Sequence, residues 1–242
     1  MKTVEFLFPE FTNIFGESYN MEYLGRCCPA LDIRRTRHQD EPLFVSQPVD
    51  MVYMGCMPES KQETALSLLR PYRNRLAQLI ADGTVFLFTG NAIELLGAGI
   101  EDDGRFIEGL GLFDFRSVRY MQRDRHNSQY IGHFKADDGD MIVLGHRSQF
   151  SFSYGAFTEP WLTIERGIGM NPDVRVEGLH RNNLFATYSL GPCFIMNPRF
   201  AKYILRLLGQ PDTLAFERET LEACDYRLRE LRNTISEAGK NG

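Results

Sequence analysis

The sequence predicts an α/β fold in which a mostly parallel central sheet carries antiparallel strands at its edge. Two observations indicate this fold. Over the first hundred residues, apolar strand-like segments alternate with segments of helical periodicity, a pattern typical of a layered sheet with right-handed crossovers. After Gly109 the helices give way to short strand-like segments with hairpin-length connections such as "DDGD", which favours antiparallel pairing.

The first half of the chain supplies the expected parallel strands and the helices between them. The run "TVFLFTG" has the composition of a parallel strand that is buried on both faces. Between residues 59 and 82 leucines repeat at helical spacing, and Pro71 is expected to introduce a kink or break. The expected strands are 3–9, 30–36, 49–56 and 84–90, and the expected helices are 20–30, 59–82 and 91–99.

The second half adds antiparallel strands, a last core strand and two helices. The antiparallel segments are expected at 110–115, 128–136, 140–146 and 148–155. A core strand at 183–192 precedes a helix in which Asn197 is expected as the cap and Pro198 at the first position. A charged amphipathic helix is expected from about Thr213 to Glu237, before frayed residues 238–242. No repeat or linker divides the chain, so we expect a single domain over residues 1–242.

Composition excludes several classes of protein. A chain of 242 residues with 43% hydrophobic residues can bury a sizeable core. The net charge of −5, with Lys and Arg dispersed, disfavours nucleic acid as a partner. The N-terminal apolar run breaks at Pro9, and no apolar stretch reaches the ~18 residues of a membrane helix. We therefore expect a cytoplasmic protein with no membrane insertion.

The five cysteines predict neither a disulfide framework nor a zinc site, because they are odd in number and lack paired ligand spacing. They are Cys27, Cys28, Cys56, Cys193 and Cys224.

Acidic clusters at 101–103 and 137–140 are typical of solvated turns rather than of a divalent metal site. We expect no metal and no cofactor. The run "RDRH" (123–126) is compatible with anion binding and equally with a solvated hairpin face.

The stretch "FTGNAIELLG" (88–97) looks like a buried strand that turns directly into a helix. A side chain at such a corner sits above free backbone N–H groups and the positive end of the helix. A cysteine there has a lowered pKa and is a competent nucleophile. In this chain the corner holds Gly90, which has no side chain.

Four stretches match motifs of one enzyme family. Residues 90–97 align without a gap with Cys-Gly-Gly-Tyr-Gln-x-Leu-Gly, and "FGESYN" (15–20) is similar to Tyr-Gly-Asp-x-Gly-Asn. "IEGLGLFDF" (107–115) matches a Glu-Gly-Leu-Gly pattern, and "NNLFATYSLGP" (182–192) matches Asn-x-Leu-x-Thr-Tyr-Leu-His-Gly-Pro. The chain thus resembles the class I glutamine amidotransferases of the cobyric acid synthase type, and within them the glutaminase subunits of lipid II isoglutaminyl synthases. This resemblance implies a flavodoxin-like three-layer sandwich.

The resemblance also locates the family's catalytic positions, and both are substituted. Gly90 takes the place of the nucleophilic cysteine and Leu190 that of the catalytic histidine. In "GHRSQFS" (145–151), Arg147 stands at an acidic position and Gln149 at a histidine. The other pocket-lining positions implied by the resemblance are Gly55 and Cys56 in the former oxyanion loop, Asn91 after the corner, and Gln129 at a basic position.

These substitutions predict that glutamine hydrolysis is lost. The reaction needs a thiolate, a histidine that moves protons, and N–H donors for the oxyanion. Removing one member of such a unit typically costs roughly 10⁴ to 10⁶ in kcat. We therefore predict a degenerate amidotransferase-like protein. The resemblance implies that it is a binding, structural or regulatory subunit of a Mur-ligase-like synthase, with another small ligand or none in the former pocket.

Two alternatives stay open. The chain could be an active amidotransferase that supplies ammonia to an amide-forming synthase in cell-wall or corrinoid synthesis. Its nucleophile would then be Cys56 or Cys193 and its base His146 or His180, whereas Thr89 lies one residue out of register. The chain could also be a homo-oligomeric structural protein with no pocket. A collapsed corner beside Gly90 would favour that last alternative.

Overall fold

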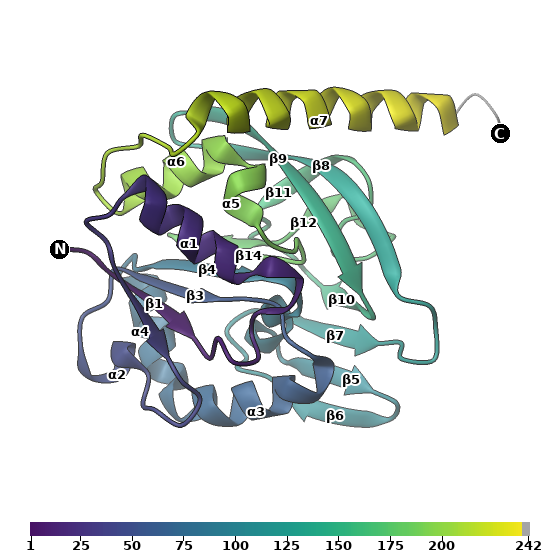
Figure 1. Ribbon diagram of the computed structural model, residues 1–242. Coiled ribbons are helices and arrows are strands. Elements are labelled where there is room, and N and C mark those ends of the chain that lie inside the picture. The colour runs from purple at the N-terminus through teal and green to yellow at the C-terminus, as the bar shows by residue number, and fades with distance from the viewer. Residues whose placement is uncertain (239–242) are drawn as a thin grey trace.

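The computed structural model describes the backbone of residues 1–238 and the side chains of residues 1–234. At its centre lies a six-stranded sheet of order β13-β14-β4-β3-β1-β2, in which every neighbouring pair is parallel except β13 with β14 (Figure 1). The strands are β1 (Thr3–Leu7), β2 (Asp32–Thr36), β3 (Met51–Met54), β4 (Val85–Thr89), β13 (Leu179–Arg181) and β14 (Leu184–Thr187). The predicted α/β fold with a mostly parallel sheet is confirmed.

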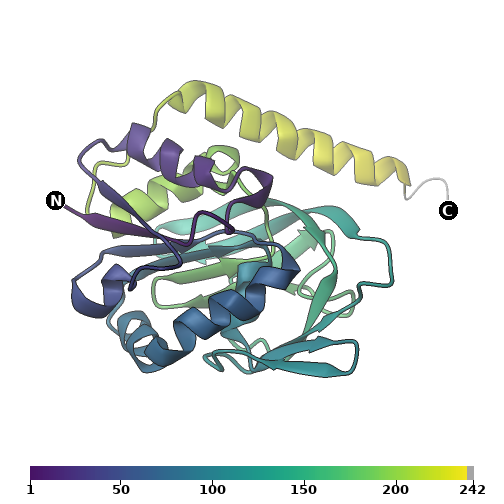
Figure 2. The same cartoon turned by 60° about the horizontal axis from the view of Figure 1, so that its bottom comes forward.

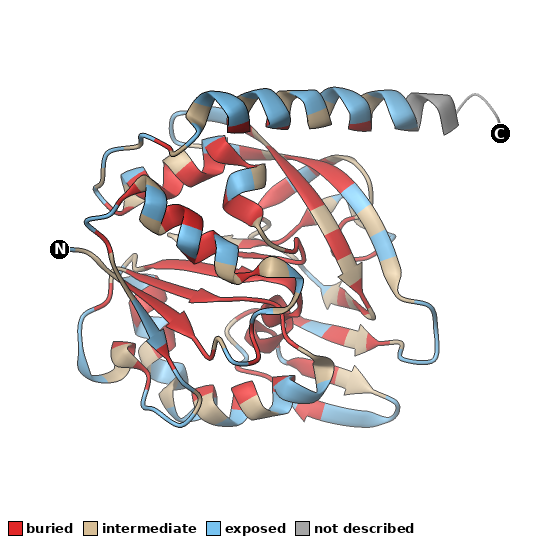
Figure 3. Cartoon of the chain, in the orientation of Figure 1, coloured by how far each residue is buried: buried red, intermediate tan, exposed pale blue. Residues whose placement is uncertain are grey.

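Helices cover both faces of this sheet, which explains why its middle strands β3 and β4 are buried at every position (Figure 3). Figure 2 shows the blue helix α3 on one side and the purple α1 and green α6 on the other. Phe86 and Phe88 of β4 pack towards the α3 side, and Val85 and Leu87 towards the α1 side. The first side holds α2 (Leu43–Ser46), α3 (Glu59–Leu69), η2 (Arg70–Tyr72) and α4 (Arg73–Ala81), and the second holds α1 (Ser18–Cys27), α5 (Cys193–Met196) and α6 (Pro198–Leu207).

The antiparallel strands lie mainly in two further sheets, so their predicted place at the edge of the central sheet was wrong except for β13. One sheet has the order β10-β7-β5-β6 and the other β12-β11-β8-β9. The second sheet packs by its face: Phe134 and Trp161 contact Phe185 of the central sheet, and Trp161 also contacts Phe200 of α6. The strands are β5 (Gly99–Asp102), β6 (Arg105–Glu108), β7 (Phe115–Arg119), β8 (His126–Ala136), β9 (Gly139–Gln149), β10 (Ser151–Gly155), β11 (Leu162–Arg166) and β12 (Val176–Glu177).

Two expected helices differ from the prediction. The corner segment forms three-ten turns, η3 (Gly90–Leu96), in place of an α-helix, and β5 begins soon afterwards at Gly99. The last helix, α7 (Glu217–Ala238), begins later than predicted; before it, the Leu214 N–H donates to Glu217 Oε2 at 3.0 Å. By contrast, the chain breaks at Pro71 as predicted, in the three-ten turn η2.

Asn197 precedes α6 as expected, but its side chain does not cap the helix. Its Oδ1 accepts the Leu144 N–H at 2.7 Å, and its Nδ2 donates to the carbonyls of Leu144 and Cys193. The side chain therefore joins β9 to the layer of α5 and α6.

Residues 239–242, which carry most of the predicted frayed end, lie outside the described residues. In the described part of the chain, no helix is both long and apolar enough to cross a bilayer.

Candidate functional site

The candidate site lies where β4 and β14 end side by side. The two strands are parallel neighbours, with Thr187 paired to Thr89, so the residues after them meet at the same edge of the sheet. The Gly90 N–H donates to the Ser189 carbonyl at 3.0 Å. Gly90 has a φ of +61°, a conformation that favours glycine. The structure thus brings together Gly90 and Leu190, the two positions at which the resemblance places catalytic residues.

The space above Gly90 is occupied by Cys56, which follows β3. A Cβ atom placed on Gly90 would lie 2.7 Å from Cys56 Sγ, closer still to Cys56 Cβ, and 3.1 Å from Leu190 Cδ2. Real Cβ atoms essentially never approach other atoms closer than 3.0 Å. Position 90 therefore has no room for a nucleophilic side chain while Cys56 keeps its place.

Cys56 does not have the surroundings of an activated thiol. It is buried, and its S–H donates to Asn91 Oδ1 at 3.4 Å. Burial and the nearby Glu17 carboxylate raise the pKa of Cys56 well above its ordinary value. Because the thiolate is the nucleophilic form, Cys56 is an inert, packed thiol near neutral pH.

The cavity at the corner is small. Its volume is about 10 Å³, and its walls include Cys56, Gly90, Asn91, Glu94, Gln149 and Leu190. A volume of about 10–15 Å³ is what one water molecule requires. Glutamine, with ten non-hydrogen atoms, does not fit into this corner as it stands.

Glu17 anchors the edge of the site, although sequence reasoning did not single it out. Its carboxylate accepts hydrogen bonds from Thr89 Oγ1 and Tyr53 OH, each at 2.6 Å, and from the Gly191 N–H at 2.8 Å. Burial raises the pKa of Glu17 to about 7, against the lowering effect of these donors. Glu17 aligns with the Asp of the family's Tyr-Gly-Asp motif, and this alignment was the signal that could have identified it. Thr89 points to this carboxylate.

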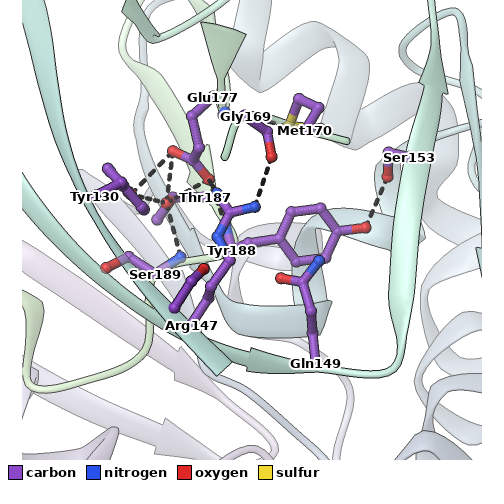
Figure 4. A network of polar contacts seen from close by, with 12 residues as sticks. Tyr130, Arg147, Gln149, Ser153, Gly169, Met170, Glu177, Thr187, Tyr188 and Ser189 are labelled. Atoms are coloured by element: carbon purple, nitrogen blue, oxygen red, sulfur yellow. Dashed lines mark hydrogen bonds and ion pairs between the residues drawn. The ribbon is translucent and has the colours of Figure 1, made fainter. Parts of the chain in front are cut away.

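Arg147 lies behind the corner in a buried polar network (Figure 4). Its Nη1 donates to the Gly169 carbonyl at 2.6 Å, and its Nη2 lies 3.4 Å from Glu177 Oε1. The Glu177 carboxylate also accepts from Tyr130 OH, Thr187 Oγ1 and the Tyr188 N–H. Burial raises the pKa of Glu177, and the Arg147 charge opposes the rise. Arg147 is thus the counter-ion of Glu177 and does not line the corner cavity.

Two other expected pocket residues lie elsewhere. Gln129 is exposed on β8, because the neighbouring Tyr130 points into the core and side chains alternate along a strand. Gly55 is packed behind the corner, where a Cβ would lie 2.7 Å from Glu17 Cβ. The structure therefore gathers Cys56, Asn91 and Gln149 around the corner, and leaves Gly55, Gln129 and Arg147 outside the cavity.

Comparison with known proteins identifies distant relatives of the chain. The GatD subunit of lipid II isoglutaminyl synthase (glutamine-hydrolyzing) from Staphylococcus aureus (strain N315) is 25% identical over 176 residues, which cover 72% of this chain and 69% of GatD. GatD of Streptococcus pneumoniae (strain ATCC BAA-255 / R6) is 24% identical over 204 residues, covering 81% of this chain and 75% of GatD. The chain is a distant homologue of GatD. No protein-family model matches it.

Solved structures of the same fold include glutamine amidotransferases. The structure of PurLQS from Thermotoga maritima matches this chain with a TM-score of 0.56 at 10% identity, covering 94% of this chain and 99% of the PurLQS chain. A structure described as a glutamine amidotransferase matches with a TM-score of 0.52 at 11% identity, covering 85% and 98%. At these identities the likeness is one of fold alone.

The alternative nucleophiles and bases of this GatD homologue do not form a pair. Burial raises the pKa of Cys193 to about 12, and its sulfur lies 4.0 Å from Asn197 Nδ2. Burial lowers the pKa of both His146 and His180. His180 stacks on Phe185 and bonds to the Leu184 carbonyl. Across the described residues, no hydrogen bond joins a cysteine sulfur to a histidine ring.

Each charged cluster noted in the sequence contributes at least one residue to an ion pair or a cation–π stack. Arg119 pairs with Asp102, and Arg206 pairs with Asp138. Arg125 stacks on the rings of Phe15 and Phe150 at the mouth of the corner cavity. Within the described part of the chain, no group of three or more His, Cys, Asp or Glu side chains is placed to hold a metal ion.

Proposed function

We propose that this GatD homologue has no glutaminase activity and acts as a binding or structural subunit of a Mur-ligase-like partner. The loss of glutaminase activity is inferred from the geometry at Gly90, and the role as a subunit is inferred from homology to GatD. Homology to GatD also favours a cell-wall context over a corrinoid one.

The observation that carries the loss of activity is the filled space at Gly90. The thiol of Cys56 lies where a side chain at position 90 would begin, and Leu190 supplies a methyl group where the family has an imidazole. Neither group can take up or deliver a proton at the corner near neutral pH. The cavity of about 10 Å³ is also too small for the substrate.

The test is ammonia release from glutamine, measured with a coupled glutamate dehydrogenase assay. The full chain is assayed alone and together with a Mur-ligase-like protein encoded in the same genome, with S. aureus GatD and its own partner as the positive control. We expect no turnover above the buffer blank in either case. Turnover that disappears in Cys56→Ala or Cys193→Ala would instead support the displaced-nucleophile alternative.

An exposed apolar patch supports the partner half of the proposal. Tyr19, Ile195 and Phe216 are 60%, 40% and 63% exposed, around a hollow of about 250 Å³ between α1, α5 and the start of α7. Exposed apolar patches on soluble proteins often mark interaction sites. Co-expression followed by size-exclusion chromatography with light scattering tests whether a stoichiometric complex forms.

A second candidate is a homo-oligomer with a purely structural role, which the collapsed corner favours. The same light-scattering measurement on the chain alone distinguishes the two. A monomer that enters a complex only with the ligase-type protein supports the proposal. A stable homo-oligomer that does not bind the ligase-type protein supports the structural role.

A further inference from the structure

The corner cavity has hydrogen-bond acceptors that lack donors. Glu94 and Gln149 both line it and are both more than nine-tenths buried. Glu94 Oε1 and Gln149 Oε1 make no hydrogen bond of 3.5 Å or less to the described protein atoms, although the Ser151 hydroxyl, which also lines the cavity, lies close enough to lower the pKa of Glu94. A buried acceptor left without a donor costs about 1–3 kcal/mol. A molecule in the cavity that donates hydrogen bonds to Glu94 Oε1 and Gln149 Oε1 would therefore be stabilised.

Neighbouring groups fix which atoms are left unpaired. The Arg119 guanidinium can only donate, and it donates to Gln62 Oε1 at 2.5 Å, so Gln62 must turn its Nε2 to Glu94 Oε2, at 2.8 Å. Gln149 Nε2 donates to the Ser151 carbonyl. Turning either amide around would set two acceptors or two donors against each other. The unpaired atoms are therefore the second carboxylate oxygen of Glu94 and the amide oxygen of Gln149.

The size of the cavity limits what can supply the donors. Its volume of about 10 Å³ corresponds to about one water molecule and excludes a larger molecule. Burial raises the pKa of Glu94 to about 7, so both protonation states are populated near neutral pH. Water can donate to the ionised carboxylate and accept from the protonated one. Ammonium has a similar size and can only donate, so it suits the ionised form alone.

We propose that this cavity is a binding site for one water molecule that bridges Glu94 Oε1 and Gln149 Oε1. The water links η3 to the end of β9. Through Gln62 and Arg119 the same chain of hydrogen bonds continues to Asp102 on β5. The corner thus holds a hydrated site that is too small for glutamine, in place of a substrate pocket.

A crystal structure of the full chain at atomic resolution, from ammonium-free potassium chloride, tests the proposal. We expect a single density peak within hydrogen-bond distance of both oxygens. A site without a peak, or a direct contact between Glu94 and Gln149, would overturn it. Gln149→Met removes the bridging acceptor and is expected to lose the peak. The matched control Gln129→Met makes the same change on the exposed face of β8 and should keep it. The unsubstituted protein decides the question even if Gln149→Met does not fold.

Ammonium shares the donor chemistry, so a second measurement separates the two sources. The ¹³C chemical shift of the Glu94 carboxyl group is titrated against pH in potassium chloride and in ammonium chloride of equal concentration. Equal midpoints support water, because the ligand then carries no charge. A lower midpoint in ammonium chloride would overturn the assignment to water and identify the cation as the donor.

Discussion

The tight contact between Gly90 and Cys56 predicts that Gly90→Ala destabilises the protein by about 2–5 kcal/mol. The new Cβ would lie 2.7 Å from Cys56 Sγ and closer to Cys56 Cβ. The sulfur can turn away about χ1, but the Cβ is fixed to the backbone of the loop after β3. Overpacking of this kind costs about 1–3 kcal/mol, and a non-glycine residue at a left-handed φ of +61° adds roughly 1–2 kcal/mol.

A double-mutant cycle separates these two contributions. Cys56→Gly removes both close atoms, so in Cys56→Gly/Gly90→Ala the overpacking disappears and the backbone cost remains. We expect a favourable coupling energy of about 1–3 kcal/mol between the two substitutions. Urea unfolding followed by circular dichroism gives the free energies, and the melting temperature of Gly90→Ala should fall by roughly 4–20 °C. Additive effects, or a Gly90→Ala protein as stable as its parent, would refute the packing described for this corner.

Three further outcomes are expected. Gly90→Cys/Leu190→His restores both family side chains, yet should release no ammonia in the glutamate dehydrogenase assay, because Cys56 still fills the space. Glu94 has a folded-state pKa of about 7 against an ordinary 4.5, so the stability it contributes is complete below about pH 4.5 and is lost as the pH rises through about 7. Relative to Glu94→Gln, the free energy of unfolding of the parent should therefore fall by about 3 kcal/mol between about pH 4 and 8, as urea titrations at a series of pH values would detect. For the apolar patch, Phe216→Asp should weaken co-purification with the ligase-type partner, whereas Phe106→Asp, a similarly exposed site on β6, should not.

The parallel core could be predicted because its signals are local. The run 85–88 is apolar at every position, and a strand buried on both faces by helices has that composition. Pro71 marks a break for an equally local reason, since it cannot donate a backbone hydrogen bond. The meeting of Gly90 and Leu190 is not local, because it depends on the parallel pairing of β4 with the distant strand β14, and the family resemblance was what indicated it.

The rest of the site depends on contacts between distant segments. Nothing in the spacing of the sequence indicates that Cys56 fills the space above Gly90, because that contact is set by the path of the loop after β3. The placement of β8 and β9 in a separate sheet follows from aromatic packing of Phe134 and Trp161 against Phe185, which strand propensity does not encode. The exposure of Gln129 could have been foreseen, because its neighbour Tyr130 is the apolar member of an alternating strand.

Two buried carboxylates, Glu17 and Glu177, hold the strand ends beside the corner in place, although the corner has no catalytic residues. Glu17 ties together the ends of β3 and β4 and the turn at Gly191, and Glu177 ties β12 to β8 and β14. Burying such groups is costly unless donors surround them, and removing one partner of a buried ion pair typically costs 3–5 kcal/mol. Arg147→Met should therefore destabilise the protein by about that amount, and Arg147→Met/Glu177→Gln by clearly less, because the amide no longer needs a counter-ion. If the double variant were as unstable as the sum of the single ones in urea unfolding, Arg147 would stabilise the site by its packing alone. The network would then be a consequence of the fold, not one of the features that hold the corner closed.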